Sequence, residues 1–190
     1  MTAGRLLRAH DRPATPWRNG GGVTREVAAG PADAGLEDFV WRVSLADVAA
    51  GGPFSSFPGV DRIITVVDGP GMELTVDGVP HTVDALYEPF AFPGDADTDC
   101  RLLGGPLVDF NVMTRRTAAT ARVRVTREGF SVAPQGGAVT LVIALAGTAT
   151  VAESGATLDR FDAVLFSGPG SGTVHVTGVT AAVTITPTGG

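Results

Sequence analysis

The stretches ITVVDGPGMELTV (64–76) and VIALAGTATVAES (142–154) decide the fold expected for this chain. Each is an apolar, β-branched run that is broken by a glycine turn and then resumed as a second short run. Further pairs follow in the same order, LYEPFAFPGD (86–95) with RFDAVLFSGP (160–169), and VDFNVM with AAVTIT near the end of each half. The recurrence predicts a duplicated β unit, although unrelated hairpins with turn glycines also resemble one another.

Outside these stretches, short runs rich in Val, Ile and Thr alternate with Gly, Pro and Asp along the whole chain. This pattern predicts an all-β protein of two jelly-roll-like halves, barrels or sandwiches, packed in one compact unit. A single turn of helix is expected over 45–50, because Gly and Pro follow it directly. We expect an N-terminal half over 1–117 that carries the ligand pocket. The C-terminal half, over 118–190, is expected to be mainly structural.

Composition limits the classes of protein to which the chain can belong. Its 190 residues, of which 44% are hydrophobic and 18% charged, suffice for a sizeable core. The net charge of −6 argues against nucleic acid or an anionic membrane surface as a partner. No apolar run is long enough for a membrane span or a leader segment. With Cys100 as its single cysteine, the chain is expected to be cytoplasmic.

Common catalytic and metal-binding patterns are missing from the sequence. The three histidines, His10, His81 and His175, are widely separated and show no metal-ligand spacing, so we expect neither a metal nor another cofactor. Acidic neighbours disfavour a thiolate at Cys100, so we assign no catalytic residue. The glycine triplet Gly20–Gly22 lacks the lysine of a phosphate-binding loop.

Three of the expected strands carry small polar side chains on one face. Thr24 and Glu26 share a face of the strand that follows the glycine triplet. Arg42 and Ser44 share a face of a second strand, and Asn111 lies on a third. Small polar groups beside a few fixed charges are typical of a pocket lining, and a solvated outer face is the alternative. The candidate ligand-binding residues are Asn19, Thr24, Glu26, Arg42, Ser44, Arg62, Asp109 and Asn111.

Four motifs in this order resemble the HutD/Ves family: PWRNGGGVTREVA (16–28), WRVSLADVAAGGPFSSFPGVDR (41–62), FPGD (92–95) and VDFNVMTRR (108–116). The resemblance covers nearly all of residues 5–117. It implies a bicupin fold and a pocket for a small organic acid in the N-terminal half. HutD proteins are encoded with histidine-utilisation genes and are thought to tune that pathway, with urocanate or formylglutamate as proposed ligands. The family's shared polar positions fall on the eight candidate residues.

These observations lead to the hypothesis of a non-enzymatic, ligand-sensing bicupin of histidine catabolism. Arg42 and Arg62 would hold carboxylates with their bidentate forks, and Glu26 would orient them. The formyl or amide part of the ligand would be bonded by Asn19, Ser44 and Asn111.

Two other interpretations remain open. A metal-free cupin enzyme, an isomerase or hydrolase, would use Glu26 or Asp109 as its general base. An interaction protein with a vestigial pocket would instead use its exposed strand edges, for example to form a homodimer.

Overall fold

The computed structural model describes residues 4–189, and its strands group into two units. One unit contains residues 13–118, and the other combines residues 4–12 with residues 119–189. Within this described part, the single helical element is a 3-10 turn, η1 (Ala9–Asp11), and no helix is long and apolar enough to cross a membrane. The prediction of an all-β chain is therefore confirmed.

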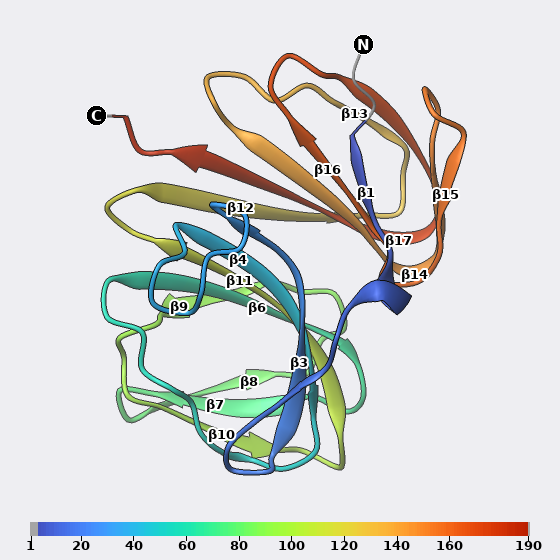
Figure 1. Ribbon diagram of the computed structural model, residues 1–190. Coiled ribbons are helices and arrows are strands. Elements are labelled where there is room, and N and C mark those ends of the chain that lie inside the picture. Colours follow the sequence, from blue (N-terminus) through green and yellow to red (C-terminus); the bar gives the residue numbers. More distant parts are fainter. Residues whose placement is uncertain (1–3, 190) are drawn as a thin grey trace. The chain divides into compact units, whose positions relative to one another are not determined.

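The first unit is built from two sheets (Figure 1). The order of its six-stranded sheet is β2-β3-β4-β11-β6-β9, and that of its four-stranded sheet is β5-β10-β7-β8. The bounds are β2 (Thr15–Pro16), β3 (Gly22–Gly30), β4 (Trp41–Val48), β5 (Gly52–Pro53), β6 (Val60–Asp68), β7 (Met72–Val76), β8 (Val79–Val83), β9 (Phe90–Pro93), β10 (Thr98–Leu102) and β11 (Leu107–Arg115).

Alternating side chains bring the two sheets together around one core. Ile64 and Val66 on β6 pack in the same buried cluster as Met72 and Leu74 on β7. Removing each such side chain from water contributes about 1.5–3 kcal/mol, so the face that holds them is fixed. The helical turn expected over 45–50 is wrong for this reason: β4 continues to Val48, which is buried in the same core.

In the second unit, two long strands form most of the core. Its elements are β1 (Arg5–Leu7), β12 (Ala119–Thr126), β13 (Phe130–Val132), β14 (Val139–Val151), β15 (Ala156–Leu158), β16 (Ala163–Ser167) and β17 (Gly172–Pro187). β14 and β17 pair along most of their length and change register beside Gly147 and Gly178, which face each other. Both glycines have positive φ, and a Cβ at Gly178 would collide with the Ala146 carbonyl oxygen. The sequence pattern predicts two short strands in place of each, over 139–146 and 149–152 for β14 and over 172–177 and 180–186 for β17; both predictions are wrong, because each strand continues past its glycine.

Residues 4–12 belong to the second unit. β1 pairs with β16, and Arg8 Nη1 donates to Asp162 Oδ2 at 2.6 Å. The backbone N–H of Ala9 donates to the other oxygen of Asp162 at 2.7 Å. This differs from the expected N-terminal half of 1–117, because long-range strand pairing assigns residues 4–12 to the other unit. The division between the units follows Ala118, one residue beyond the expected position.

Candidate functional site

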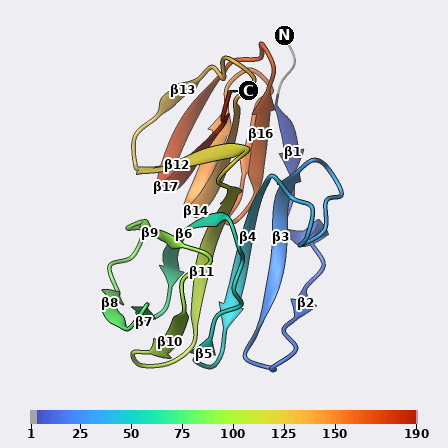
Figure 2. The same cartoon turned by 90° about the vertical axis from the view of Figure 1, so that its left-hand side faces the viewer.

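The central strands of the six-stranded sheet bring most of the candidate residues to one face. β3, β4 and β11 lie side by side (Figure 2), and β6 follows β11. Ser44 is paired with Glu26 on one side and with Asn111 on the other. Arg42 and Arg62 are both paired with Met113, one row further along. This is the face that holds the core of the unit, so the polar groups point between its two sheets.

Arg62 is a buried cation surrounded by aromatic rings. Arg62 is 7% exposed. Its guanidinium carbon lies 5.0 Å from the ring centre of Phe54, 5.8 Å from that of Phe57 and 5.1 Å from that of Phe92. Burial lowers the pKa of Arg62 to about 10, with Asp109 opposing the shift and Arg42 adding to it. The rings attract the cation but accept no conventional hydrogen bond from its N–H groups.

Asp109 is a buried acid whose charge acts on Arg62. It is 2% exposed, and burial raises the pKa of its carboxyl to about 7. Arg62 partly offsets this rise, while Asp47 adds to it. Within residues 4–189, Asp109 and Arg62 form no ion pair at contact distance. The carboxyl is therefore poised to gain or lose a proton near neutral pH.

Three atoms of this site lack hydrogen-bond partners. Among residues 4–189, six buried side-chain N or O atoms have no partner, and three of them are Arg62 Nε, Asp109 Oδ1 and Asn111 Oδ1. Leaving such a group unpaired costs about 1–3 kcal/mol, and more for a charged group. One donor and two acceptors on the same face thus form a complementary set for a polar guest.

Arg42 and Glu26 form an ion pair on β4 and β3, next to the strand that carries Asp109 and Asn111. Arg42 Nε donates to Glu26 Oε2 at 2.7 Å, and the Glu26 side chain is 43% exposed. Ser44, which lies between Glu26 and Asn111 in register, is buried. Glu26 therefore holds Arg42 in place and leaves the other guanidinium nitrogens of Arg42 for a second acceptor. The expected contact of Glu26 with Arg62 is not among the ion pairs of residues 4–189.

Asn19 and Thr24 already have structural partners. Thr24 Oγ1 accepts a hydrogen bond from Trp17 Nε1 at 2.7 Å, which ties the turn to β3. Asn19 is exposed, and its Oδ1 accepts the backbone N–H of Gly21 at 2.9 Å. Thr24 is paired with Ala46 and so lies on the inner face, but its hydroxyl oxygen is already engaged by Trp17. Of the eight candidates, only Asn19 lies outside this face and its rim, in the glycine-rich turn.

Sequence reasoning missed the three rings around Arg62. Phe54 and Phe57 lie in the motif that spans residues 41–62, and Phe92 lies in FPGD (92–95), but none of the three is among the candidate residues. Their common approach to one arginine depends on the pairing of β9 with β6 and on the path of the chain before β6. The signal available in the sequence was a phenylalanine directly before each of two proline-glycine turns, at Phe57 and Phe92, with Arg62 soon after the first turn.

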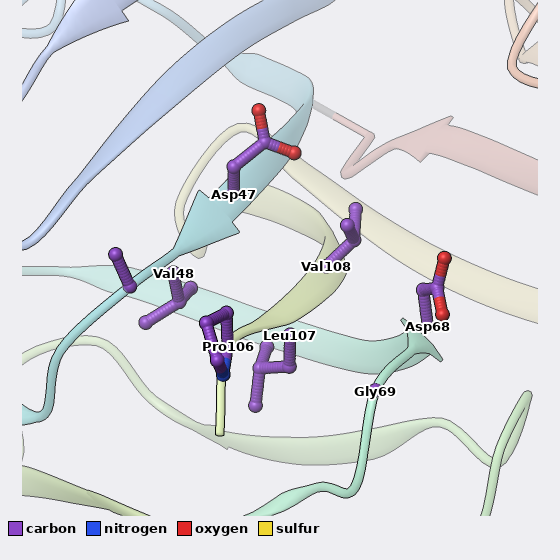
Figure 3. Close-up of a pocket in the computed structure, with 8 residues that line it drawn as sticks. Asp47, Val48, Asp68, Gly69, Pro106, Leu107 and Val108 are labelled. Carbon is purple, nitrogen blue, oxygen red and sulfur yellow. The ribbon is translucent and has the colours of Figure 1, made fainter.

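A hollow of about 330 Å³ lies elsewhere in this unit, at the ends of β4, β6 and β11 (Figure 3). Asp47, Asp68 and apolar residues line it, and the Asp47 carboxylate already binds the Arg25 guanidinium. In the described part of the chain, no group of three or more His, Cys, Asp or Glu side chains is arranged to hold a metal ion. The unpartnered atoms around Arg62 are therefore the better candidate site.

Known proteins resemble this chain over most of its length. The HutD family model matches residues 9–184. A Pseudomonas putida protein, described as an uncharacterized 21.2 kDa protein in the hutC 3' region, is 44% identical over 124 residues, 65% of this chain and 65% of that protein. Protein Ves of Citrobacter koseri is 41% identical over 133 residues, 69% of this chain and 68% of that protein.

Solved structures share the fold. HutD from Pseudomonas fluorescens SBW25 superimposes with a TM-score of 0.86 and 37% identity, covering 98% of this chain and 100% of that one. A cupin 2 conserved barrel domain protein from Leptotrichia buccalis superimposes with a TM-score of 0.62 and 10% identity, covering 99% of this chain and 98% of that one. The second likeness concerns the fold alone.

Proposed function

This chain belongs to the HutD family, and from that premise we propose that its first unit binds a small organic acid of histidine utilisation without converting it. The hutC neighbourhood named for the Pseudomonas putida relative supports the choice of pathway. The proposed role is that of a sensor, in which occupancy of the site tunes the pathway.

The unpartnered triad of Arg62 Nε, Asp109 Oδ1 and Asn111 Oδ1 carries this proposal. A carboxylate matches the Arg62 donor, because charge-assisted hydrogen bonds are the stronger ones. An N–H group of the same ligand matches the two acceptor oxygens. Such an acid removes the cost of three unpaired buried groups at once, which a carboxylate without an N–H group does not.

Urocanate and formylglutamate both meet this requirement. Urocanate carries a carboxylate and an imidazole N–H, and formylglutamate carries carboxylates and an amide N–H. Arg42 is placed to take a second carboxylate or to strengthen the hold on the first, since its other nitrogens are not used by Glu26. The aromatic rings around Arg62 exclude water from its faces and thereby strengthen the pairing.

Thermal shift with matched ligand pairs tests the proposal. Urocanate is compared with its furan analogue, which lacks the N–H, and formylglutamate with glutarate, which lacks the amide. At about a hundred times Kd a ligand stabilises by about 2.7 kcal/mol, or about 5–11 °C for a chain of this size. We expect this shift for one of the two N–H acids and a much smaller one for its analogue.

A pair of arginine variants locates the effect. Arg62→Met removes the charge but keeps a long apolar side chain among the rings, and it should abolish the shift. Arg25→Met is the matched control, because Arg25 lies in the same sheet and binds Asp47. Full ligand stabilisation of a folded R62M protein would contradict the proposal, as would the absence of any shift with either acid in the unmodified protein.

A metal-free enzyme is the second candidate, and one observation favours it. The Asp109 pKa of about 7 matches what a general base needs near neutral pH. Proton NMR of each acid incubated with the protein separates the two functions. Unchanged substrate signals with line broadening support a binding protein, whereas new product signals that disappear with Asp109→Asn support an enzyme.

A further inference from the structure

We propose that the second unit carries its own binding site, for a small organic carboxylate with an apolar body. The site is a groove of about 530 Å³ on the inner side of β12, β14 and β17, facing β13. It is separate from the site around Arg62 and does not depend on the function proposed for that site. The residues that carry the argument are Arg122, Arg124, Phe130, Thr140, Thr184 and Thr186.

Strand register places the polar groups of the groove in one row. Arg122 on β12 is paired with Thr184 on β17, and Thr184 is paired with Thr140 on β14. Thr140 lies on the same face of β14 as Val142, which is part of the buried core of this unit. Two threonine hydroxyls and a guanidinium therefore line up across three neighbouring strands at the edge of the core.

The groove has an excess of positive charge. Arg122 and Arg124 are two residues apart on one strand and point to the same face, about 7 Å apart at their Cα atoms. Neither forms an ion pair within residues 4–189, and none of the residues lining the groove is Asp or Glu. Two adjacent cations repel each other, and an anion bound between them relieves that repulsion. This local excess contrasts with the net charge of −6 for the whole chain.

The opposite wall is apolar and orients one arginine. The Arg124 guanidinium carbon lies 5.8 Å from the ring centre of Phe130, which holds the cation in the groove. Val132 and Ala138 complete this wall, and both are buried. A carboxylate on the arginine side and an apolar body on the Phe130 side match the two walls. Inorganic phosphate would match the first wall alone.

The groove lies on strands of the second unit that correspond to the strands of the Arg62 site in the first unit. β11 lies between β4 and β6, and the second part of β17 lies between β12 and β14. Asn111 on β11 is paired with Ser44, and Thr184 on β17 is paired with Arg122. In residues 4–189, β12 has β17 as its single strand partner, whereas β4 also has β3. The groove is therefore the more open version of one site architecture.

A titration followed by NMR tests this proposal. The probe is benzoate, compared with acetate, which lacks the apolar body, and with inorganic phosphate, all at constant ionic strength. We expect saturable shifts of the Arg122 and Arg124 Nε–Hε signals and of the β12 and β13 amides with benzoate. Acetate and phosphate should bind about tenfold more weakly, because each loses the contacts of one wall.

Variants identify the groups responsible. Arg122→Gln and Arg124→Gln should each weaken benzoate about tenfold, as expected for loss of a charge-assisted hydrogen bond. Arg5→Gln is the control, because Arg5 is an exposed arginine on β1 of the same unit and does not line the groove. Because NMR reports each residue, shifts confined to β6 and β11 would count against this groove without affecting the first proposal. Non-saturable shifts, equal affinity for phosphate, or unchanged binding in the double variant R122Q/R124Q would also overturn it.

Discussion

Replacing Asp109 with Asn should stabilise the protein, and by more at high pH than at low pH. Burial raises the pKa of this carboxyl to about 7, whereas an aspartate in an unfolded chain titrates at about 3.9. The folded state therefore keeps a proton that the unfolded state releases. The sign follows: the stability contributed by this group is complete below about pH 4 and is lost as the pH rises to about 7.

The pKa difference sets the size of the effect. About three pKa units at about 1.4 kcal/mol each give an upper limit of about 4 kcal/mol between the two ends of the range. Between about pH 5 and about pH 8, ionisation of Asp109 lowers the free energy of unfolding by about 3 kcal/mol. An Asn at this position has no charge and causes no such loss. For a chain of this length, the advantage of D109N in Tm should therefore grow by about 6–12 °C over that interval.

Thermal melts of both proteins across this range, in buffers without carboxylates, measure the difference. Taking the difference at each pH removes the titration of all other groups. Asp99→Asn is the control, because Asp99 is exposed on β10. A Tm difference between D109N and the unmodified protein that stays constant from low to high pH would refute the reasoning, as would a carbon-13 titration of Asp109 with an ordinary aspartate midpoint.

Two further predictions concern the second unit. Burial alone would raise the pKa of Asp162, but hydrogen bonds from Ala9 and Arg8 outweigh it and hold the pKa below its usual range; its stabilising effect is thus lost as the pH falls into the acid range. Asp162→Ala should lower the free energy of unfolding by about 1–3 kcal/mol and should speed trypsin cleavage after Arg8. An unchanged cleavage rate would contradict this. Gly178→Ala should lower Tm more than Gly105→Ala, because both glycines have φ near +145° but a Cβ meets a β14 backbone oxygen only at Gly178; equal losses would contradict this.

Local alternation of side chains was enough to predict the inner face of the first unit. Ser44 and Asn111 lie on strands far apart in the sequence, yet each was assigned to a polar face, and the structure pairs them directly. Period-2 alternation is a property of the strand itself, so it survives whatever the strand packs against. Alternation does not locate the ends of β14 and β17, because the glycines inside those strands lie beside a change of register and do not end the pairing.

Features that depend on long-range packing were not predictable in the same way. Pairing of Arg5–Leu7 with β16 joins residues about 160 positions apart, and no motif in the first twelve residues indicates it. The Phe54, Phe57 and Phe92 rings are likewise brought to one arginine only when β9 pairs with β6. Because these contacts decide how much water reaches Arg62, they also decide its pKa, which no sequence pattern reveals.

The two proposed sites lie on corresponding strands but differ in how deeply their arginines are buried, and burial sets the free-energy cost of a charge. Arg62 is buried and its pKa is lowered, so removing its charge from water is costly, and the proposed ligand offsets this cost because it satisfies several groups at once. Arg122 and Arg124 are exposed, so they stay solvated at little cost. An anion held by them gains less and is screened more strongly by salt. The two proposals therefore assign a selective site and a weaker, salt-sensitive site to corresponding strands of the two units.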